Sequence, residues 1–247
     1  GTHMLAVCQP SVPAFAAAAV MGKHEDPCRP ATLTMMGGPI DTREAPTSVN
    51  DVAMNQPLSW FENNVIATVP LTYPGAGRRV YPGFLQLAGF MAMNLGNHMI
   101  SHYGMFKHLV EGDEDGAAAT KAFYDEYRSV CDLTAEFYLQ TVEHVFQRHS
   151  LPKGEFVHRG EVIDLAGIRD TALLAVEGEK DDISGIGQTR AALHLAPKLP
   201  DEQKKYFLAE GVGHYGIFNG SKWRNLIAPV LEDWIRQHQK KPLKIVA

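Results

Sequence analysis

One short segment, residues 171–176, constrains the fold of this chain more than any other, because nearly every residue in it is apolar. A strand that is apolar on both faces is typical of a parallel sheet with helices packed on both sides. Other candidate strands lie at 5–7, 31–36 and 206–209. Helix-prone segments alternate with these strands, so the sequence predicts an α/β fold built on a parallel sheet.

Composition places the chain among globular proteins and argues against some partners. The 247 residues include 23 basic and 28 acidic side chains, which gives a formal net charge of −5. Nucleic acid is therefore not expected as the main partner, because phosphate-binding surfaces need an excess of Lys and Arg. The cysteines, Cys8, Cys28 and Cys131, are too scattered for a disulfide framework or a CxxC metal site. This cysteine usage indicates a reducing compartment.

No segment predicts a membrane span or a secretion signal. The most apolar stretch, 84–95, is interrupted by Gln86, Gly89 and Asn94 and is shorter than the roughly 18–20 residues that a spanning helix needs. No basic region precedes the apolar run 14–21, which argues against a signal peptide. We therefore expect a soluble, cytoplasmic protein.

The middle of the chain differs in character from its two ends. Residues Tyr138, Val142 and Val145 recur at helical spacing, and Asp132 is expected to cap that helix. Near the C-terminus, Pro229 is expected to kink the last helix. We expect the chain to have three parts. Residues 1–43 form part of the core, with the first strand, a sharp turn and the following βα unit. Residues 44–152 form a largely helical cap insertion, and residues 153–247 form the rest of the core.

Two local features complete the expected secondary structure. Residues 156–157 and 162–163 flank Arg159-Gly160 and predict a small hairpin. Residues 1–4 resemble an expression remnant and are left out of the first strand.

Three candidate reactive groups follow three of the expected strands. They are Cys8, then Asp181 or Asp182, and then His214. Ligands of open α/β sheets bind at the carboxyl ends of the strands. The chain order of nucleophile, acid and histidine is that of α/β-hydrolases. The turn at Cys8 resembles a nucleophile elbow, although proline stands at position 10 where the usual motif has glycine.

These residue types support acyl transfer through a cysteine nucleophile. His214 would take the thiol proton, the aspartate would hold the imidazole in its working tautomer, and the backbone N–H of Gln9 would donate to the oxyanion. Ser11 is an alternative nucleophile, but it lies past the apex of the turn. The competing interpretations are a small buried core cysteine, a structural histidine and a solvated Asp-Asp turn.

Two other features admit a functional interpretation. His98 and His102 are four residues apart and could share a helix face, as metal ligands do, but no H-E-x-x-H motif accompanies them. A structural or surface role is favoured, and no metal is expected. The apolar segment 84–95 is interpreted as a core or lid helix, or as a contact for a water-insoluble substrate.

The chain resembles the intracellular polyhydroxyalkanoate depolymerases, which act on short-chain polyester granules. The resemblance extends over nearly the whole chain. It implies an α/β-hydrolase fold with a cap between Arg43 and about Pro152, a triad of Cys8, Asp181 and His214, and cleavage of ester bonds in poly(3-hydroxybutyrate). It implies no metal or organic cofactor. The motifs that carry it are AVCQPSVP (6–13), MGGPIDTR (36–43), RRVYPGFLQL (78–87), VEGEKDDISG (176–185) and GVGHYGIFNG (211–220).

Members of this family have further sequence before the elbow, which supplies early strands and a second oxyanion donor. We therefore expect the 247-residue chain alone to be poorly active and prone to associate, unless a missing N-terminal segment or another chain completes the sheet. The expected partner is a polyester granule or a 3-hydroxyalkanoate oligomer, and the granule surface is a further expected location. Two alternatives stay open: acyl transfer to a thiol such as coenzyme A, and a non-catalytic granule-surface protein.

Overall fold

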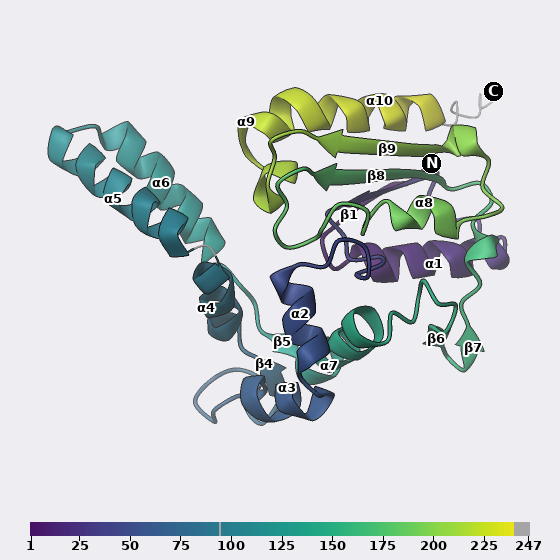
Figure 1. Cartoon of the computed structure of the whole chain (residues 1–247), viewed down its shortest axis with the longest axis horizontal. Helices are drawn as coiled ribbons and strands as arrows, with labels where there is room; N and C mark the ends of the chain where they lie inside the picture. The colour runs from purple at the N-terminus through teal and green to yellow at the C-terminus, as the bar shows by residue number, and fades with distance from the viewer. Residues whose placement is uncertain (94, 240–247) are drawn as a thin grey trace, which may run out of the picture. The chain divides into compact units, whose positions relative to one another are not determined.

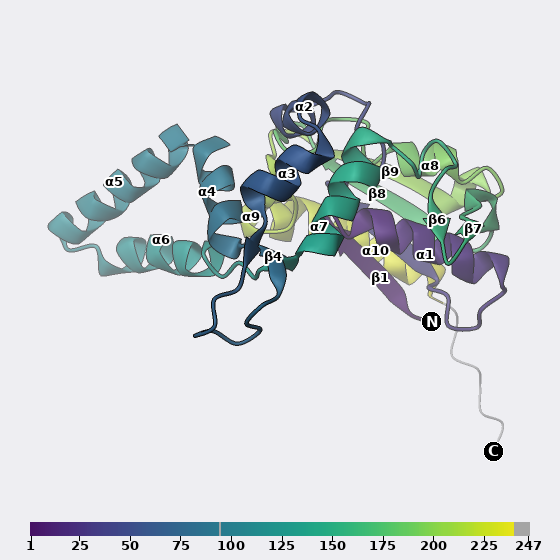
Figure 2. The same cartoon turned by 90° about the horizontal axis from the view of Figure 1, so that it is seen from below.

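The computed structural model describes residues 1–93 and 95–239, and these form two compact units. One unit comprises Gly1–Gln56 with Thr141–Ala247, and the other comprises Pro57–Gln140. Figures 1 and 2 show the elements of each unit from two directions.

A four-stranded parallel sheet forms the centre of the first unit. Its strands are β1 (His3–Val7), β2 (Thr32–Met36), β8 (Ala172–Gly178) and β9 (Lys204–Ala209), in the order β1-β2-β8-β9. Every residue of β8 is buried, as the apolar sequence predicts. The predicted α/β fold with a parallel sheet is therefore confirmed.

Helices cover both faces of this sheet, and the strand residues alternate between two apolar clusters (Figure 1). Leu33 and Leu173 pack in one cluster with helix α1 (Ser11–Lys23) and helix α8 (Ala191–Leu195). Met36 and Leu174 pack in the other with Leu231 and Trp234 of helix α10 (Ala228–His238). The period-2 alternation of β-strands produces this division.

The termini of the first unit differ from the sequence-based expectations in two places. His3 and Met4 belong to β1 and pair with Thr32 and Leu33, so leaving these two residues out of the strand was wrong. The last helix is interrupted rather than simply kinked. Helix α9 (Gly220–Lys222) runs into a π-helical turn, Trp223–Ile227, and the regular helix α10 starts immediately before Pro229. Proline is tolerated in a first helical turn because its missing N–H has no partner there.

The rest of the first unit connects the sheet to the inserted residues. Helix α2 (Ser48–Asn55) precedes the insertion, and the π-helical turn Val142–Gln147 follows it. The side chain of Gln147 donates to the carbonyls of Ala53 and Gln56, at 2.9 Å each. The predicted hairpin is present as β6 (Val157–His158) and β7 (Glu161–Val162), followed by a 3-10 turn at Leu165–Gly167.

The second unit is mostly helical. A small antiparallel sheet joins β3 (Ala67–Thr68), β4 (Arg79–Tyr81) and β5 (Leu133–Thr134). The carboxylate of Asp132 accepts from the N–H of Gly83 at 2.7 Å, so Asp132 caps α4 and not the helix that follows it. The helices are α3 (Leu58–Val65), α4 (Gly83–Met93), α5 (Leu95–Glu111), α6 (Glu114–Tyr127) and α7 (Ala135–Thr141).

Over the described ranges, no helix combines the length and the apolar content that crossing a bilayer requires.

Candidate active site

Cys8 lies at the apex of a sharp turn between β1 and α1. Its backbone φ is 61°, in the left-handed region that non-glycine residues seldom occupy. The N–H of Cys8 donates to the carbonyl of Met36 at 2.8 Å, and the N–H of Ser11 donates to the carbonyl of Cys8 at 3.0 Å. These bonds hold a strained strand–turn–helix connection, which is the backbone form of a nucleophile elbow.

Ser11 has a structural role in this turn. Its hydroxyl is fully buried and donates to the carbonyl of Ala6 at 3.0 Å. Gly38 packs so closely that a Cβ at its position would lie 2.2 Å from Ser11 Oγ. The Ser11 hydroxyl is therefore enclosed, whereas Cys8 remains partly exposed.

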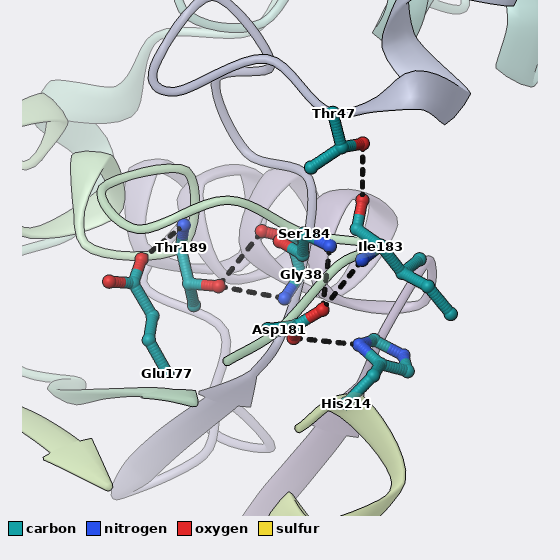
Figure 3. Close-up of polar contacts among 8 residues, drawn as sticks. All are labelled: Gly38, Thr47, Glu177, Asp181, Ile183, Ser184, Thr189 and His214. Carbon is teal, nitrogen blue, oxygen red and sulfur yellow. Dashed lines mark hydrogen bonds and ion pairs between the residues drawn. The ribbon is translucent and has the colours of Figure 1, made fainter. Parts of the chain in front are cut away.

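The structure brings Asp181 and His214 together after β8 and β9 (Figure 3). Nδ1 of His214 lies 2.8 Å from Oδ2 of Asp181, and the two side chains are only 5% and 1% exposed. The other oxygen of Asp181 accepts from the N–H groups of Ile183 and Ser184, at 2.9 and 2.8 Å. Asp182 is exposed. Asp181 is thus the aspartate in contact with the histidine.

Cys8 also influences the protonation of His214. Burial lowers the pKa of His214, but hydrogen bonds with Asp181 and Cys8 outweigh it and raise the pKa to about 10. Because Nδ1 bonds to Asp181, Nε2 is the ring nitrogen left for Cys8. Cys8, Asp181 and His214 thus all follow strands of the parallel sheet at their carboxyl ends, and His214 is bonded to Asp181.

Gly37 allows the loop after β2 to approach the histidine. Its φ is 57°, and a Cβ there would lie 3.1 Å from Cε1 of His214 and 3.3 Å from Oδ2 of Asp181. A side chain at this position would press on the His–Asp pair and strain the backbone. The close approach accounts for the Gly-Gly pair at the end of β2.

A buried carboxylate that sequence reasoning missed supports this loop. Glu177 is 1% exposed and accepts from the N–H groups of Gly187, Thr189 and Arg190 at 2.8–2.9 Å, and from the hydroxyl of Tyr206 at 2.8 Å. The burial of Tyr206 and its bond to Glu177 raise the pKa of the Tyr206 phenol. The sequence feature that could have indicated this buried carboxylate is a single acidic residue near the end of an otherwise apolar strand.

Thr189 links this carboxylate to the turn beside Cys8 (Figure 3). The N–H of Gly38 donates to Oγ1 of Thr189 at 2.7 Å, and that hydroxyl donates to the carbonyl of Gly38 at 2.9 Å. Glu177 thus accepts from the backbone N–H of Thr189, and the Thr189 hydroxyl bonds to both the N–H and the carbonyl of Gly38. These buried hydrogen bonds position the loop that packs against the turn at Cys8.

The predicted oxyanion donor lies next to Cys8. Within the described part of the chain, the N–H of Gln9 donates to no acceptor, although its carbonyl accepts from the N–H of Val12 at 3.2 Å. An N–H left unused beside a nucleophile can stabilise a developing oxyanion.

The other candidate residues lie outside this arrangement. His98 Nδ1 lies 3.0 Å from the hydroxyl of Tyr124, and His102 Nδ1 lies 2.8 Å from the carbonyl of His98, so both rings are engaged within the second unit. Of the residues that the structure describes, no three His, Cys, Asp or Glu side chains form a group suited to a metal ion. The segment 84–95 lies in α4 and the start of α5, apart from residue 94, which is outside the described residues.

Comparison with protein families gives one match that covers most of the chain. Residues 37–239 match the family described as "PHB de-polymerase C-terminus". This range includes Asp181 and His214 and begins after Cys8. Comparison with curated proteins gave no match.

Solved structures with similar folds have low sequence identity to this chain. An esterase domain from Rhodothermus marinus is 11% identical, with a TM-score of 0.45, and the match covers 96% of this chain and 61% of that one. The α/β hydrolase GrgF from a Penicillium species is 16% identical, with a TM-score of 0.43, and the match covers 96% of this chain and 63% of that one. A monoacylglycerol lipase from Paleococcus ferrophilus is 11% identical, with a TM-score of 0.46, and the match covers 91% of this chain and 65% of that one. This chain spans less than two thirds of the length of each.

Proposed function

The chain belongs to the PHB de-polymerase C-terminus family, and from this premise we propose that it hydrolyses ester bonds of a short-chain polyhydroxyalkanoate such as poly(3-hydroxybutyrate). The observation that carries the proposal is the 2.8 Å contact between Nδ1 of His214 and Oδ2 of Asp181, and the effect of Cys8 on the pKa of His214 supports it. This arrangement suits acyl transfer and needs no metal or organic cofactor.

In the proposed first step, the sulfur of Cys8 attacks the carbonyl carbon of an ester while His214 takes the thiol proton. The N–H of Gln9 stabilises the negative charge that develops on the carbonyl oxygen. The C–O bond of the ester then breaks, and His214 returns the proton to the departing alcohol. The products are an alcohol-terminated fragment and a thioester on Cys8.

In the proposed second step, water attacks this thioester. His214 takes a proton from the water, the C–S bond breaks, and the thiol of Cys8 recovers its proton as the carboxylic acid leaves. Asp181 stays ionised and holds the Nδ1–H tautomer of His214 throughout. The pKa of His214, raised to about 10, makes the imidazole a strong acceptor for the thiol proton in the first step and for the water proton in the second.

The second unit, Pro57–Gln140, is proposed to act as the cap. Its compact, mostly helical structure within the expected insertion 44–152 supports this role. The expected cytoplasmic location at polyester granules also belongs to this proposal.

The test combines selective labelling with an activity assay. Cys28 and Cys131 are exposed, whereas Cys8 is only partly exposed, so accessibility alone favours labelling of the first two. Faster reaction of iodoacetamide at Cys8 would therefore report chemical activation by His214. Mass spectrometry of tryptic peptides gives the three rates in one sample, and His214→Gln is the control that should remove the preference.

The activity assay uses amorphous poly(3-hydroxybutyrate) and a soluble chromogenic ester, with and without coenzyme A. Release of 3-hydroxy acids that stops after labelling of Cys8 supports the proposal. A thioester product in the presence of coenzyme A would indicate acyl transfer instead. Slow labelling of Cys8 together with no turnover of either ester would contradict the proposed activity and favour a non-catalytic granule protein.

A further inference from the structure

Helix α5 (Leu95–Glu111) has an apolar surface that the second unit does not cover. None of its residues is buried. Among its large apolar side chains, Met99 is 65% exposed, Phe106 58% and Val110 70%. Apolar side chains gathered on one exposed surface, unlike single ones, indicate an interaction site.

These side chains form a stripe along one side of the helix. Leu95, Met99, Tyr103, Phe106 and Val110 follow one another at intervals of three or four residues, which places them on a common face. The rings of Tyr103 and Phe106 stack with centroids 6.5 Å apart. We refer to these five residues as the α5 stripe.

The packing of α5 against α6 (Glu114–Tyr127) uses a different side of the helix. A shallow groove of about 490 Å³ between the two helices is lined from α5 by Ser101, Gly104, Met105 and His108. These positions lie on the side of α5 away from the stripe. The helix therefore has its partner within the unit and still presents an apolar face.

The charge pattern indicates what this face contacts. Residues 83–106 contain no Lys, Arg, Asp or Glu, and the ammonium of Lys107 lies over the ring of Tyr103, 5.2 Å from its centroid. Interfacial helices that bind anionic lipids place Lys and Arg on their polar face, and nucleic-acid surfaces need the same residues. A helix face with so few charged side chains instead matches a surface that is apolar and uncharged.

We propose that the α5 stripe docks the protein on the uncharged surface of a solid polyester. This inference rests on the proposed function, because it takes the polyester to be the substrate. Such a surface presents methyl groups and ester carbonyls and carries charge only at chain ends. Burial of the stripe against the methyl groups provides binding, and the exposed hydroxyl of Tyr103 can donate to an ester carbonyl.

The test measures binding to polymer separately from hydrolysis. The full chain carrying Cys8→Ala is sedimented with surfactant-free amorphous poly(3-hydroxybutyrate) particles. Two double variants of it place charges on the stripe, Met99→Glu with Val110→Glu and Met99→Lys with Val110→Lys. The matched controls place the same charges at Ala118 and Ala122, which are exposed on α6 outside the groove. Circular dichroism checks that each variant is folded.

The expected result is a loss of particle binding of about tenfold or more for both stripe variants, because a charge of either sign opposes transfer to an apolar surface. The control variants should bind like the Cys8→Ala chain. Equal binding by stripe and control variants would overturn the inference. So would binding to phosphatidylserine vesicles in preference to polymer, or a dimer in sedimentation velocity that the stripe variants abolish without any polymer binding by the parent.

Failure of the proposed function gives a different result. Absence of ester hydrolysis by the unsubstituted chain, with stripe-dependent binding retained, would contradict the enzyme activity alone. Hydrolysis of the soluble ester, with polymer binding that does not depend on the stripe, would contradict the docking alone.

Discussion

At the scale of single residues, the backbone of Cys8 is the most informative feature. A left-handed conformation costs a non-glycine residue about 1–2 kcal/mol. Cys8 adopts it at φ 61° in the turn between β1 and α1. Strain of this kind persists where the surrounding structure enforces it, which is common at functional sites.

This strain leads to a prediction with two substitutions. Cys8→Ala should abolish ester cleavage and leave the free energy of unfolding nearly unchanged. Cys8→Gly should abolish cleavage equally and raise the free energy of unfolding by about 1 kcal/mol, because glycine adopts positive φ at little cost. Urea unfolding of the three proteins provides the comparison. If the glycine variant were no more stable than the alanine variant, the elbow would not be strained.

The two neighbouring aspartates should differ sharply in their effect on rate. Asp181→Asn should lower kcat by orders of magnitude, up to about 10⁴-fold, because the amide stabilises the wrong tautomer of His214. Asp182→Asn should have a small effect, because this side chain is exposed. Steady-state kinetics on a soluble ester measures both. The reverse order of effects would assign the role to Asp182.

The raised pKa of His214 also predicts how stability depends on pH. The folded protein holds the His214 proton up to a pKa of about 10, whereas the unfolded chain releases it near 6.5. The stabilisation is therefore complete below about pH 6.5 and is lost as pH rises through 10. In between, this group should lower the free energy of unfolding by about 1.4 kcal/mol per pH unit.

Urea unfolding between pH 6.5 and 10 tests this dependence, with His214→Gln as the variant that lacks the group. The unsubstituted chain should lose stability more steeply over this range than the variant. Parallel pH profiles for the two proteins would contradict the raised pKa.

At the scale of secondary-structure elements, the site depends on how the loops after the strands are held. Glu177, the last residue but one of β8, accepts from three backbone N–H groups of the loop that contains Thr189. Thr189 in turn binds both backbone groups of Gly38. The loops after β2 and β8 are thus joined through buried polar groups. Each of the groups named here has a hydrogen-bond partner.

Thr189→Val tests the hydrogen bonds that join the two loops, because it removes the hydroxyl that bonds to Gly38. Valine has nearly the same shape but leaves the buried N–H of Gly38 without an acceptor, which costs about 1–3 kcal/mol. We expect this loss in urea unfolding together with a reduced kcat, because Gly38 packs against Ser11 beside the elbow. Thr68→Val, on the exposed strand β3, is the control and should change stability by less than about 0.5 kcal/mol. Equal effects of the two substitutions would refute the connection.

The elements could be predicted from the sequence where local pattern determines them. The buried strand β8 and the β6–β7 hairpin follow from apolar runs and turn residues. Asp132 was assigned to the wrong helix because a capping carboxylate can bond to a helix start that is remote in sequence, here Gly83. The partners of Glu177 could not be predicted for the same reason, since the sequence does not specify which loop a buried carboxylate meets.

At the scale of the whole molecule, strand β1 forms one edge of the sheet. In the described residues no strand pairs with its outer side, and Leu5 on this strand is 47% exposed. Exposed edges with apolar side chains promote pairing between molecules.

We therefore expect the chain to self-associate with increasing concentration and Leu5→Lys to weaken the association, because charged residues on edge strands disfavour pairing. Sedimentation velocity over a range of concentrations is the measurement. Leu71→Lys, at an exposed leucine in a loop of the second unit, is the control and should leave the association unchanged. A monomer at all concentrations would contradict the expectation.

The side chain of Gln147 has a consequence for the order in which the chain folds during synthesis. Strand β2 cannot pair with β8 until residues 57–140 have been translated, and two parallel strands alone are only marginally stable. Helices α5 and α6 contact each other locally and can form during this interval. Gln147 binds the carbonyls of Ala53 and Gln56 and so joins the two ends of the intervening segment 57–140. Formation of this contact before β8 pairs would shorten the loop that the sheet still has to close, and with it the period in which the nascent sheet depends on chaperones.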